Sequence, residues 1–396
     1  MSEHFHFTAA QANMKRALAL AKDFVSQKSM LPVLHSVMLE GKAGDSFLTL
    51  TATNLESVLR IRVAANVLNS GAMCATYMVL RDLVNTLPGD EPIEFKVEDD
   101  LRVEIVSGGR SQETNLILYD PAEYPLIPTV PHETHSVSCT LNGKTIQRVA
   151  AEVAPLAAAD STRPTLTGVS LRFANGRLEA AATDGFRLAR LILPDPDAIE
   201  RALIVPAAVM VPVGKMVKLA AEAQNVDTEF LPVQMFVDKD GARVFWSIGE
   251  GYIATMLINN TYPDYGPIIP DASTTEAAVG AKTAYERVQV VGVIASESDG
   301  STIHIQAATK DEEEIFRMFA SCASVGDADG DMPADVTGPD VEMSVAAKYL
   351  TRSLAIFKAG DGDVVFGMTT PMEPLMLTWL DDDSLLHLIM PMHQSR

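Results

Sequence analysis

One short segment of the chain is similar to the end of a phosphate-binding loop. Gly143, Lys144 and Thr145 follow one another as they do in that loop, in which backbone amides and the lysine hold a nucleotide phosphate. The loop also needs a glycine five positions before Gly143, and Ser138 stands there. We therefore interpret the segment as an ordinary helix start, with Asn142 near the N-cap.

Three acidic segments contain enough carboxylates to bind a metal ion. Asp327–Asp331 alternates like the start of a calcium loop, but the positions that require Gly and Glu hold Met332 and Gly338. The acid runs at 311–314 and 381–383 would point in several directions from a turn, so they are poorly placed to converge on one ion. We expect all three segments to be solvated, and the Gly/Pro/Asp-rich stretch Asp327–Asp340 to be a mobile surface loop.

Histidine and cysteine patterns give no sign of a reactive site. The eight histidines show no metal-binding spacing such as HExxH, and we expect His304 and His387, in alternating strands, to lie at the surface. Cys74, Cys139 and Cys322 are isolated, which favours a reduced, cytoplasmic setting. No GxSxG elbow, secretory leader or membrane-spanning run is visible. The sequence thus predicts no catalytic residue, no metal and no cofactor.

The elements that would position a site recur along the chain. Ser29–Leu39 aligns with Ser161–Leu171 at an offset of 132 residues (161 − 29). Arg16 and Arg148 have the same offset, and 132 is one third of the 396 residues. We expect three copies of one module, each the size of a small domain. Their predicted bounds are residues 1–131, 132–271 and 272–396.

Each module is predicted to be α+β, with two helices packed on antiparallel strands. Alternating apolar residues separated by turn signals indicate the strands. Helical periodicity indicates two helices in each module. The predicted helices are Thr8–Ser26, Tyr77–Leu87, Asn142–Ala159, Pro206–Gln224, Ala281–Ser296 and Ser344–Ala359.

Charge is distributed unevenly between these elements. The whole chain has a net charge of −21, which taken alone argues against a nucleic-acid partner. The six predicted helices nevertheless hold thirteen bases and five acids, a net charge of +8. Solvation of exposed helix faces does not predict this bias of sign, so we interpret the bases as one functional surface. They are Lys15, Arg16, Lys22, Arg81, Lys144, Arg148, Lys215, Lys218, Lys282, Arg287, Lys348, Arg352 and Lys358.

A tight turn in the second module has the composition of a binding site. Asp184 and Gly185 are followed by an aromatic and a basic residue, Phe186 and Arg187, between two predicted strands. Asp-Gly is a common hairpin pair, but the matching turn of the first module, in Ala52–Glu56, has no glycine. The composition of the second turn therefore indicates a role in binding.

At these residues the chain resembles the bacterial DNA polymerase III β sliding clamp (processivity factor) family. Segments in the family's order carry the resemblance over all three modules: Lys28–Leu34, Ala52–Glu56, Arg163–Gly168, Ala182–Ala189, Tyr262–Tyr265, Ile268–Pro270 and Leu388–Met392. The resemblance implies a non-catalytic ring of two chains joined head to tail, with helices around a hole for duplex DNA. Topology holds such a ring on DNA, so weak phosphate contacts suffice and no base sequence is read.

The resemblance also implies two kinds of protein contact. A groove would bind short linear motifs of the replicative polymerase, the clamp loader and repair proteins. Its residues would be Leu166, Thr183, Gly185, Phe186, Arg187, Leu188, Pro263, Ile268, Tyr349, Leu388, Met390, Pro391 and Met392. The homodimer would close between the edge strand Asn115–Tyr119 of one chain and the third module of the other. Its contacts would be Leu116, Ile117, Leu118 and Ile294.

Three alternatives stay open from sequence alone. Departures from the family pattern, such as Phe186 where the family often has histidine, allow a divergent or accessory clamp. The acidic segments allow a metal-dependent hydrolase. The acidic composition also allows an adaptor that binds proteins and never DNA.

Overall fold

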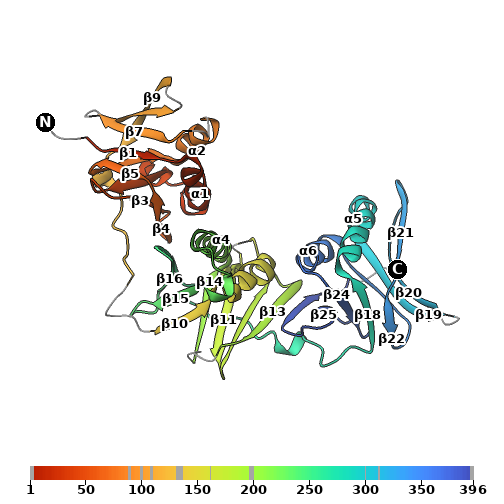
Figure 1. Cartoon of the computed structure of the whole chain (residues 1–396). Coiled ribbons are helices and arrows are strands. Elements are labelled where there is room, and N and C mark those ends of the chain that lie inside the picture. Colours follow the sequence, from red (N-terminus) through yellow and green to blue (C-terminus); the bar gives the residue numbers. More distant parts are fainter. Residues whose placement is uncertain are drawn as a thin grey trace. The chain divides into compact units, whose positions relative to one another are not determined.

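The chain forms two compact units. The structure is a computed structural model that describes residues 4–87, 91–98, 101–107, 110–130, 137–160, 162–195, 200–298, 300–310 and 313–392. Unit 1 comprises Met1–Gln147 and Ala208–Asn259, and unit 2 comprises Arg148–Ala207 and Asn260–Arg396 (Figure 1). No helix in these described ranges is long and apolar enough to cross a membrane.

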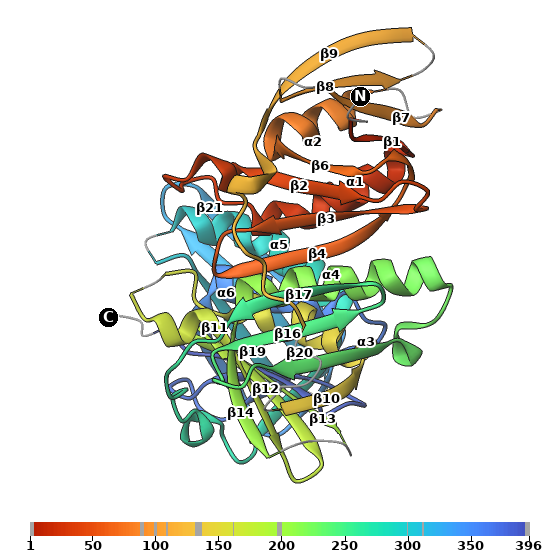
Figure 2. The same ribbon diagram turned by 90° about the vertical axis from the view of Figure 1, so that its left-hand side faces the viewer.

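Unit 1 is built on one 13-stranded antiparallel sheet in the order β10-β15-β16-β17-β4-β3-β2-β6-β9-β8-β7-β1-β5. The strands are β1 (His6–Ala9), β2 (Ser36–Gly41), β3 (Phe47–Thr53), β4 (Ser57–Ala64), β5 (Asn66–Asn69), β6 (Gly71–Thr76), β7 (Ile93–Glu98), β8 (Arg102–Ser107), β9 (Arg110–Tyr119), β10 (Val137–Asn142), β15 (Pro232–Val237), β16 (Arg243–Ile248) and β17 (Gly251–Met256). Strands β4 and β17 lie side by side and join the first predicted module to the second (Figure 2). The sheet is therefore continuous across a module boundary.

Three helices cover this sheet: α1 (Gln11–Ala21), α2 (Tyr77–Thr86) and α4 (Ala207–Gln224). The apolar faces of α1 and α2 bury Met14, Leu18, Leu80 and Val84. The buried amide of Gln11 donates hydrogen bonds to the carbonyls of Val84 (2.7 Å) and Leu87. These bonds satisfy carbonyls at the C-terminal end of α2 that have no partner within the helix, so one polar side chain fastens α1 to α2.

Unit 2 contains a 9-stranded sheet, β14-β11-β12-β13-β26-β25-β24-β18-β22, and a 4-stranded sheet, β21-β20-β19-β23. The strands are β11 (Gly168–Ala174), β12 (Arg177–Thr183), β13 (Arg187–Pro194), β14 (Arg201–Pro206), β18 (Thr275–Gly280), β19 (Thr302–Lys310), β20 (Glu313–Cys322), β21 (Gly326–Met332), β22 (Asp335–Thr337), β23 (Val341–Ala346), β24 (Asp363–Met368), β25 (Leu375–Trp379) and β26 (Leu385–Ile389). Helices α5 (Ala281–Glu297) and α6 (Ala347–Phe357) pack beside one another (Figure 1). The β13–β26 pair crosses the second module boundary as β4–β17 crosses the first.

Short 3-10 turns repeat at the predicted spacing. Turn η2 (Pro32–His35) and turn η6 (Pro164–Thr167) start at prolines that are 132 residues apart (164 − 32). In both turns the amide of the leucine donates to the carbonyl of the residue before the proline. The repeat seen in the sequence is thus also a repeat of backbone hydrogen bonds.

The structure corrects three expectations about elements. The mobile loop predicted at Asp327–Asp340 is wrong, because strands β21 and β22 make up most of this stretch. Small side chains alternate with aspartates in β21, and Gly330 is buried under the stem of Arg287 on α5. Helices predicted to start at Thr8 and Ser344 start later, at Gln11 and Ala347, after strands β1 and β23.

The predicted helix Asn142–Ala159 is also interrupted. It divides into α3 (Gly143–Arg148), a π turn (Val149–Val153) and a 3-10 turn (Ala154–Leu156). Pro155 explains the end of regular helix, because proline has no amide hydrogen and its ring clashes with the carbonyl four residues earlier.

Candidate protein-binding surface and nucleic-acid interface

The glycine turn of unit 2 is held by its own side chains. The Thr183 hydroxyl donates to the Arg187 carbonyl (2.6 Å) and accepts from the Gly185 amide (3.0 Å). Asp184 Oδ1 accepts from the amides of Phe186 (3.0 Å) and Arg187 (3.1 Å). Gly185 has φ +91°, a conformation that side chains disfavour. The turn is therefore rigid, and Phe186 projects from it with 59% of its surface exposed.

Arg187 stabilises this turn from a buried position and does not present its charge to solvent. Its side chain is only 3% exposed. Nε donates to Asp184 Oδ2 (2.9 Å), and Nη2 donates to the Pro155 carbonyl (3.1 Å). The guanidinium also lies 5.3 Å from the centre of the Tyr349 ring. Arg187 thus ties the turn to the 3-10 turn after α3 and to the first turn of α6.

We name the surface around this turn and the end of β26 the β13–β26 surface. Leu188 and Leu388 face each other in the strand pair and are buried beneath it. The Met390 amide donates to the Phe186 carbonyl (2.9 Å), which places Met390 next to the turn. The rings of Phe186 and Tyr349 stack at 6.0 Å. Four of the predicted residues form an exposed apolar rim: Phe186, Ile268, Met390 and Met392.

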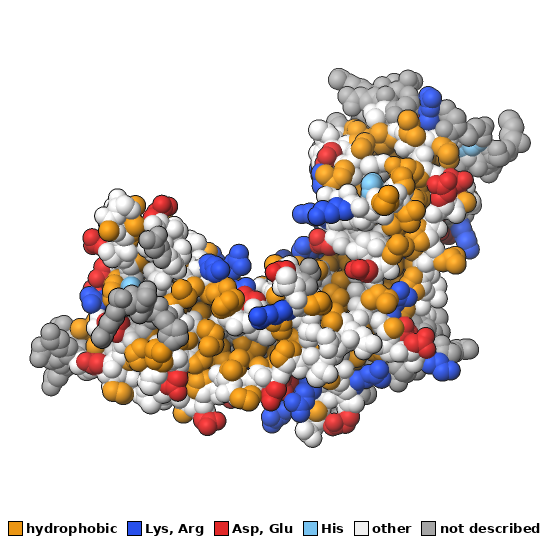
Figure 3. All heavy atoms as spheres, turned by 180° about the vertical axis from the view of Figure 1, so that it is seen from behind, with side chains coloured by type: hydrophobic (Ala, Val, Ile, Leu, Met, Phe, Trp, Pro, Cys, Tyr) orange, Lys and Arg blue, Asp and Glu red, His pale blue; other side chains and the backbone are white. Residues whose placement is uncertain are grey.

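The remaining predicted residues of this surface lie inside it or at its edge. The buried ones are Leu166, Thr183, Arg187, Leu188 and Leu388. Pro263 is exposed, and Pro391 forms a β-bridge with Val345. On the face shown in Figure 3, hydrophobic side chains gather over unit 2. Some of the predicted residues are exposed and others are buried, a distinction that the sequence did not make.

Tyr262 also stabilises the turn, although it is not among the residues predicted for this surface. Its hydroxyl oxygen accepts a hydrogen bond from the Thr183 amide (3.1 Å). Burial raises the pKa of Tyr262 to about 12, so the phenol stays neutral. Tyr265 packs against the leucines under the surface, and its hydroxyl donates to Glu179 Oε1 (2.8 Å).

His387 on β26 is completely buried, so the prediction that it lies at the surface is wrong. Its Nε2–H donates to the Glu152 carbonyl (3.0 Å), and its ring meets Phe357 edge-on at 5.2 Å. Nδ1 is buried and has no hydrogen-bond partner among the described residues. Burial lowers the pKa of His387 to about 4, so the ring is neutral near pH 7.

The thirteen predicted DNA-facing bases differ in how far their charge is compensated. Five of them form ion pairs with acids: Arg81, Lys144, Arg148, Lys215 and Lys282. The other eight form no ion pair within the part of the chain that the structure describes. They are Lys15, Arg16, Lys22, Lys218, Arg287, Lys348, Arg352 and Lys358. Uncompensated cations on helices are suited to contact phosphates.

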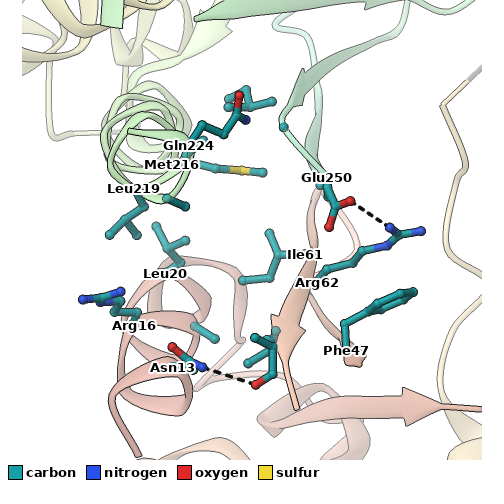
Figure 4. Close-up of a pocket in the computed structure, with 18 of the residues that line it drawn as sticks. Asn13, Arg16, Leu20, Phe47, Ile61, Arg62, Met216, Leu219, Gln224 and Glu250 are labelled. Carbon is teal, nitrogen blue, oxygen red and sulfur yellow. Dashed lines mark hydrogen bonds and ion pairs between the residues drawn. The ribbon is translucent and has the colours of Figure 1, made fainter. Parts of the chain in front are cut away.

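Arg16 and Arg148 hold equivalent places in the repeat but have different surroundings. Arg148 is half-buried and binds Glu152 (3.0 Å) and Asp382 (3.3 Å). Arg16 is exposed beside a cavity of about 530 Å³ between α1, β4, α4 and the β16–β17 turn (Figure 4). The acid of that turn, Glu250, is paired with Arg62 (3.1 Å). Arg16 thus forms no ion pair with a described acid, whereas two acids neutralise Arg148.

Apolar side chains are exposed where the family resemblance implies the dimer contact. Ile117 on β9 is 81% exposed, whereas Leu118 is buried and Leu116 and Ile294 are half-buried. Next to Ile294 on α5, Val290 and Val293 are 59% and 64% exposed. These two valines were not among the predicted contacts, and both lie off the buried seam of α5.

Described residues contain no group of three His, Cys, Asp or Glu side chains that could hold a metal ion. The carboxylates of β21 point to solvent, except that Asp329 pairs with Arg317 at 3.4 Å. The geometry therefore offers an exposed apolar surface beside a hydrogen-bonded turn, and a set of helical cations that form no ion pair with a described acid, two of which, Lys348 and Lys358, lie over tyrosine rings. Both are features of binding rather than of catalysis.

Known families match nearly the whole chain. Residues 5–128, 140–264 and 267–393 match, in order, the N-terminal, central and C-terminal domains of the DNA polymerase III beta subunit. The beta sliding clamp of Synechococcus elongatus is 26% identical over 385 residues, which are 96% of this chain and 97% of that protein. The beta sliding clamp of Staphylococcus epidermidis is 23% identical over 375 residues, which are 93% of each chain.

Solved structures share the fold. The DNA polymerase III beta subunit of Thermotoga maritima aligns with a TM-score of 0.82 and 21% identity, covering 99% of this chain and all of that one. The DNA polymerase sliding clamp of Bacillus subtilis aligns with a TM-score of 0.81 and 19% identity, over 99% of this chain and 100% of that one. The predicted α+β fold of three similar clamp domains is confirmed. The chain belongs to the DNA polymerase III beta subunit family.

Proposed function

We propose that this protein is a DNA sliding clamp. Two copies close into a ring around duplex DNA, and the ring tethers the replicative polymerase, the clamp loader and repair proteins. The clamp has no catalytic residue of its own and works in the cytoplasm. Family membership over the whole chain is the observation that carries the proposal. It leaves the alternatives of a hydrolase and of an adaptor that never meets DNA without support.

The uncompensated helical cations explain how an acidic chain meets DNA. The net charge of −21 repels a polyanion at long range, but salt screens that field beyond about 8–10 Å. Within that distance the local bases on the helices decide the sign of the interaction. Phosphate contacts from Lys and Arg bind without reading sequence, so the ring can slide. We propose the eight unpaired bases as the main DNA contacts, and assign Arg148 to the ion pairs of unit 2.

We propose the β13–β26 surface as the site for short partner peptides. Phe186, Ile268, Met390 and Met392 offer exposed apolar side chains, and methionine adapts to different partners. Gly185 supplies the positive φ of the turn, and the Arg163 guanidinium lies next to it, 3.2 Å from where a Cβ would stand. The buried Arg187 and Thr183 keep the turn in shape.

We propose that three modules, with bounds at residues 1–131, 132–271 and 272–396, make up each half of the ring. The two copies join head to tail, so each contact is heterologous and pairs two different surfaces. The rotation that relates the copies closes the ring. Ile117 on β9 of one copy would meet Val290, Val293 and Ile294 on α5 of the other.

The DNA proposal is tested with circular and linear duplexes. A loaded ring should stay on a closed circle and run off a linear duplex of the same length. Reversing Lys348, Arg352 and Lys358 to Glu on unit 2 should lower retention on circles, because it places negative charge opposite phosphates. Lys28→Glu, Lys42→Glu and Lys239→Glu together change net charge equally, at exposed positions outside the helices. This control should retain DNA normally. Equal loss from circle and linear duplex would refute the ring.

The peptide proposal is tested with two exposed residues of the β13–β26 surface. Met390→Ala and Phe186→Ala should each weaken binding of a polymerase-derived peptide about tenfold, since a central contact is worth over about 1 kcal/mol. Leu188 is a poorer choice because it is 1% exposed, and truncating a buried leucine costs about 2–5 kcal/mol of stability. Dimer mass measured by light scattering should not change. Unaltered peptide affinity in both variants would exclude the surface.

A further inference from the structure

Unit 1 contains a second turn with the hydrogen bonds of the glycine turn. The Thr53 hydroxyl donates to the Ser57 carbonyl (2.9 Å) and accepts from the Leu55 amide (3.0 Å). Asn54 Oδ1 accepts from the amides of Glu56 (3.1 Å) and Ser57 (2.7 Å). These are the four bonds that Thr183 and Asp184 make in unit 2, so the two turns are equivalent residue by residue.

The strand pair next to this turn is equivalent as well. Val58 faces Ala254 in β4–β17, as Leu188 faces Leu388 in β13–β26. The Met256 amide donates to the Glu56 carbonyl at 2.9 Å. This bond matches the one from Met390 to Phe186, and both methionines are about equally exposed, 41% for Met256 and 39% for Met390. A methionine therefore stands at the end of the last strand at both surfaces: Met256 ends β17, and Met390 directly follows β26.

Leu55 is strained and still presents its side chain to water. It takes the place of Gly185 with φ +77°, where a leucine is rarely found. Its surface is 51% exposed. Strained residues of this kind persist where the surroundings hold them, and they gather at ligand-binding sites. In the preceding segment Leu31, the counterpart of Arg163, is 54% exposed.

A guanidinium with an unused donor lies beside Met256. Arg243 pairs with Met256 across β16–β17, and its Nη2 lies 3.4 Å from the methionine sulfur. Its Nε is buried and has no hydrogen-bond partner among the described residues. At the β13–β26 surface the arginine of the turn is already bound to Asp184. This buried Nε is out of reach of a ligand, but Arg243 is only half-buried and forms no ion pair with a described acid. Its charge next to an apolar side chain is suited to a carboxylate.

We propose that Leu55, Met256 and Arg243 form a second peptide-docking site, the β4–β17 surface. Its occupant is a short extended peptide with apolar side chains for Leu55 and Met256 and an acidic side chain for Arg243. The proposal extends the proposed function, because it rests on the equivalence with the β13–β26 surface. It gives each chain two docking sites that differ in their demand for a carboxylate.

The probe is the acetylated, amidated peptide Leu-Ser-Leu-Phe-Asp, titrated into the full dimer. The methyl groups of methionine carry the isotope label, and Met256→Leu and Met390→Leu assign the two reporter signals. Both signals should shift and saturate, each with its own dissociation constant. A second probe with Asn in place of Asp should bind about tenfold more weakly at Met256, since a hydrogen bond to a charged group is lost. Its dissociation constant at Met390 should equal that of the first probe.

Arg243→Gln supplies the matched variant. It should weaken the first probe about tenfold at Met256 only, and remove the difference between the two probes there. A Met390 signal that saturates while the Met256 signal stays still would overturn the second site and leave the proposed function intact. A Met256 signal that saturates while the Met390 signal stays still would overturn the β13–β26 surface and keep the second site. No shift of either methionine signal would overturn both sites.

Discussion

Acidification should destabilise unit 2 through His387. The neutral ring donates one hydrogen bond, from Nε2–H to the Glu152 carbonyl, and its Nδ1 has no partner. Protonation at Nδ1 would place a charged N–H in a completely buried site without an acceptor. The fold therefore lowers the pKa of this ring, whereas in the unfolded chain the ring is protonated at its ordinary pKa.

The sign and the size of the effect follow from the two pKa values. The pKa of His387 is about 4 in the fold and about 6.5 in an unfolded chain. Below pH 6.5 the unfolded chain binds more protons, so stability falls as pH falls, until about pH 4. At pH 5.5 the folded ring is still neutral, and the loss relative to pH 7.5 is about 1.4 kcal/mol, one pKa unit. This pH stays above the isoelectric point of about 4.7.

The measurement is urea unfolding followed by the fluorescence of Trp379, with Trp246→Phe removing the tryptophan of unit 1. His387→Gln is the control, because glutamine can donate to the Glu152 carbonyl and does not titrate. The histidine chain should lose about 1.4 kcal/mol more than this control between pH 7.5 and pH 5.5. Equal losses in the two chains would show that His387 is not held neutral by the fold.

Substitutions at positive φ should change stability in opposite directions. Leu55→Gly should raise the stability of unit 1 by about 1 kcal/mol, because φ +77° strains a leucine and not a glycine; a lower urea midpoint would contradict the strain. Gly338→Ala should destabilise unit 2 by more than about 2 kcal/mol, since the new Cβ would lie 2.1 Å from the Thr274 carbonyl oxygen at φ +95°. Gly326→Ala, at φ +136° with no atom within 4 Å of the new Cβ, should cost less, and an equal effect would refute the clash.

Among the described residues, periodicity found six helices and placed the starts of α2 and α5 correctly, but it placed those of α1 and α6 too early. Ala10, Thr76, Gly280 and Ala346 stand at N-cap positions and make no side-chain cap bond. Five of the six helices, α2, α3, α4, α5 and α6, begin directly after a strand. Without a capping residue the sequence has no boundary signal, and helix periodicity was extended back into β1 and β23.

The candidate surface was predictable in outline because its turn has unusual composition. Exposure was not predictable, since Arg187 and Phe186 are adjacent and one is buried while the other is exposed. The equivalence of Met256 with Met390 was also hidden. The two are 134 residues apart (390 − 256) and the turns are 130 apart (183 − 53), so neither follows the offset of 132. Insertions between elements shift the spacing, and hydrogen bonds show the match that alignment misses.

A charge count over helices overstates how many bases can reach DNA, and the two equivalent arginines show why. Arg148 is neutralised because Asp382 and Glu152 both reach it. Arg16 forms no ion pair with a described acid, and Glu250, on the opposite side of the nearby cavity, is bound by Arg62. The Arg62 guanidinium also lies 4.0 Å from the Phe47 ring centre. The two arginines hold equivalent places in the repeat, so their difference comes from the acids that pack beside each of them, which a count of charges along helices does not record.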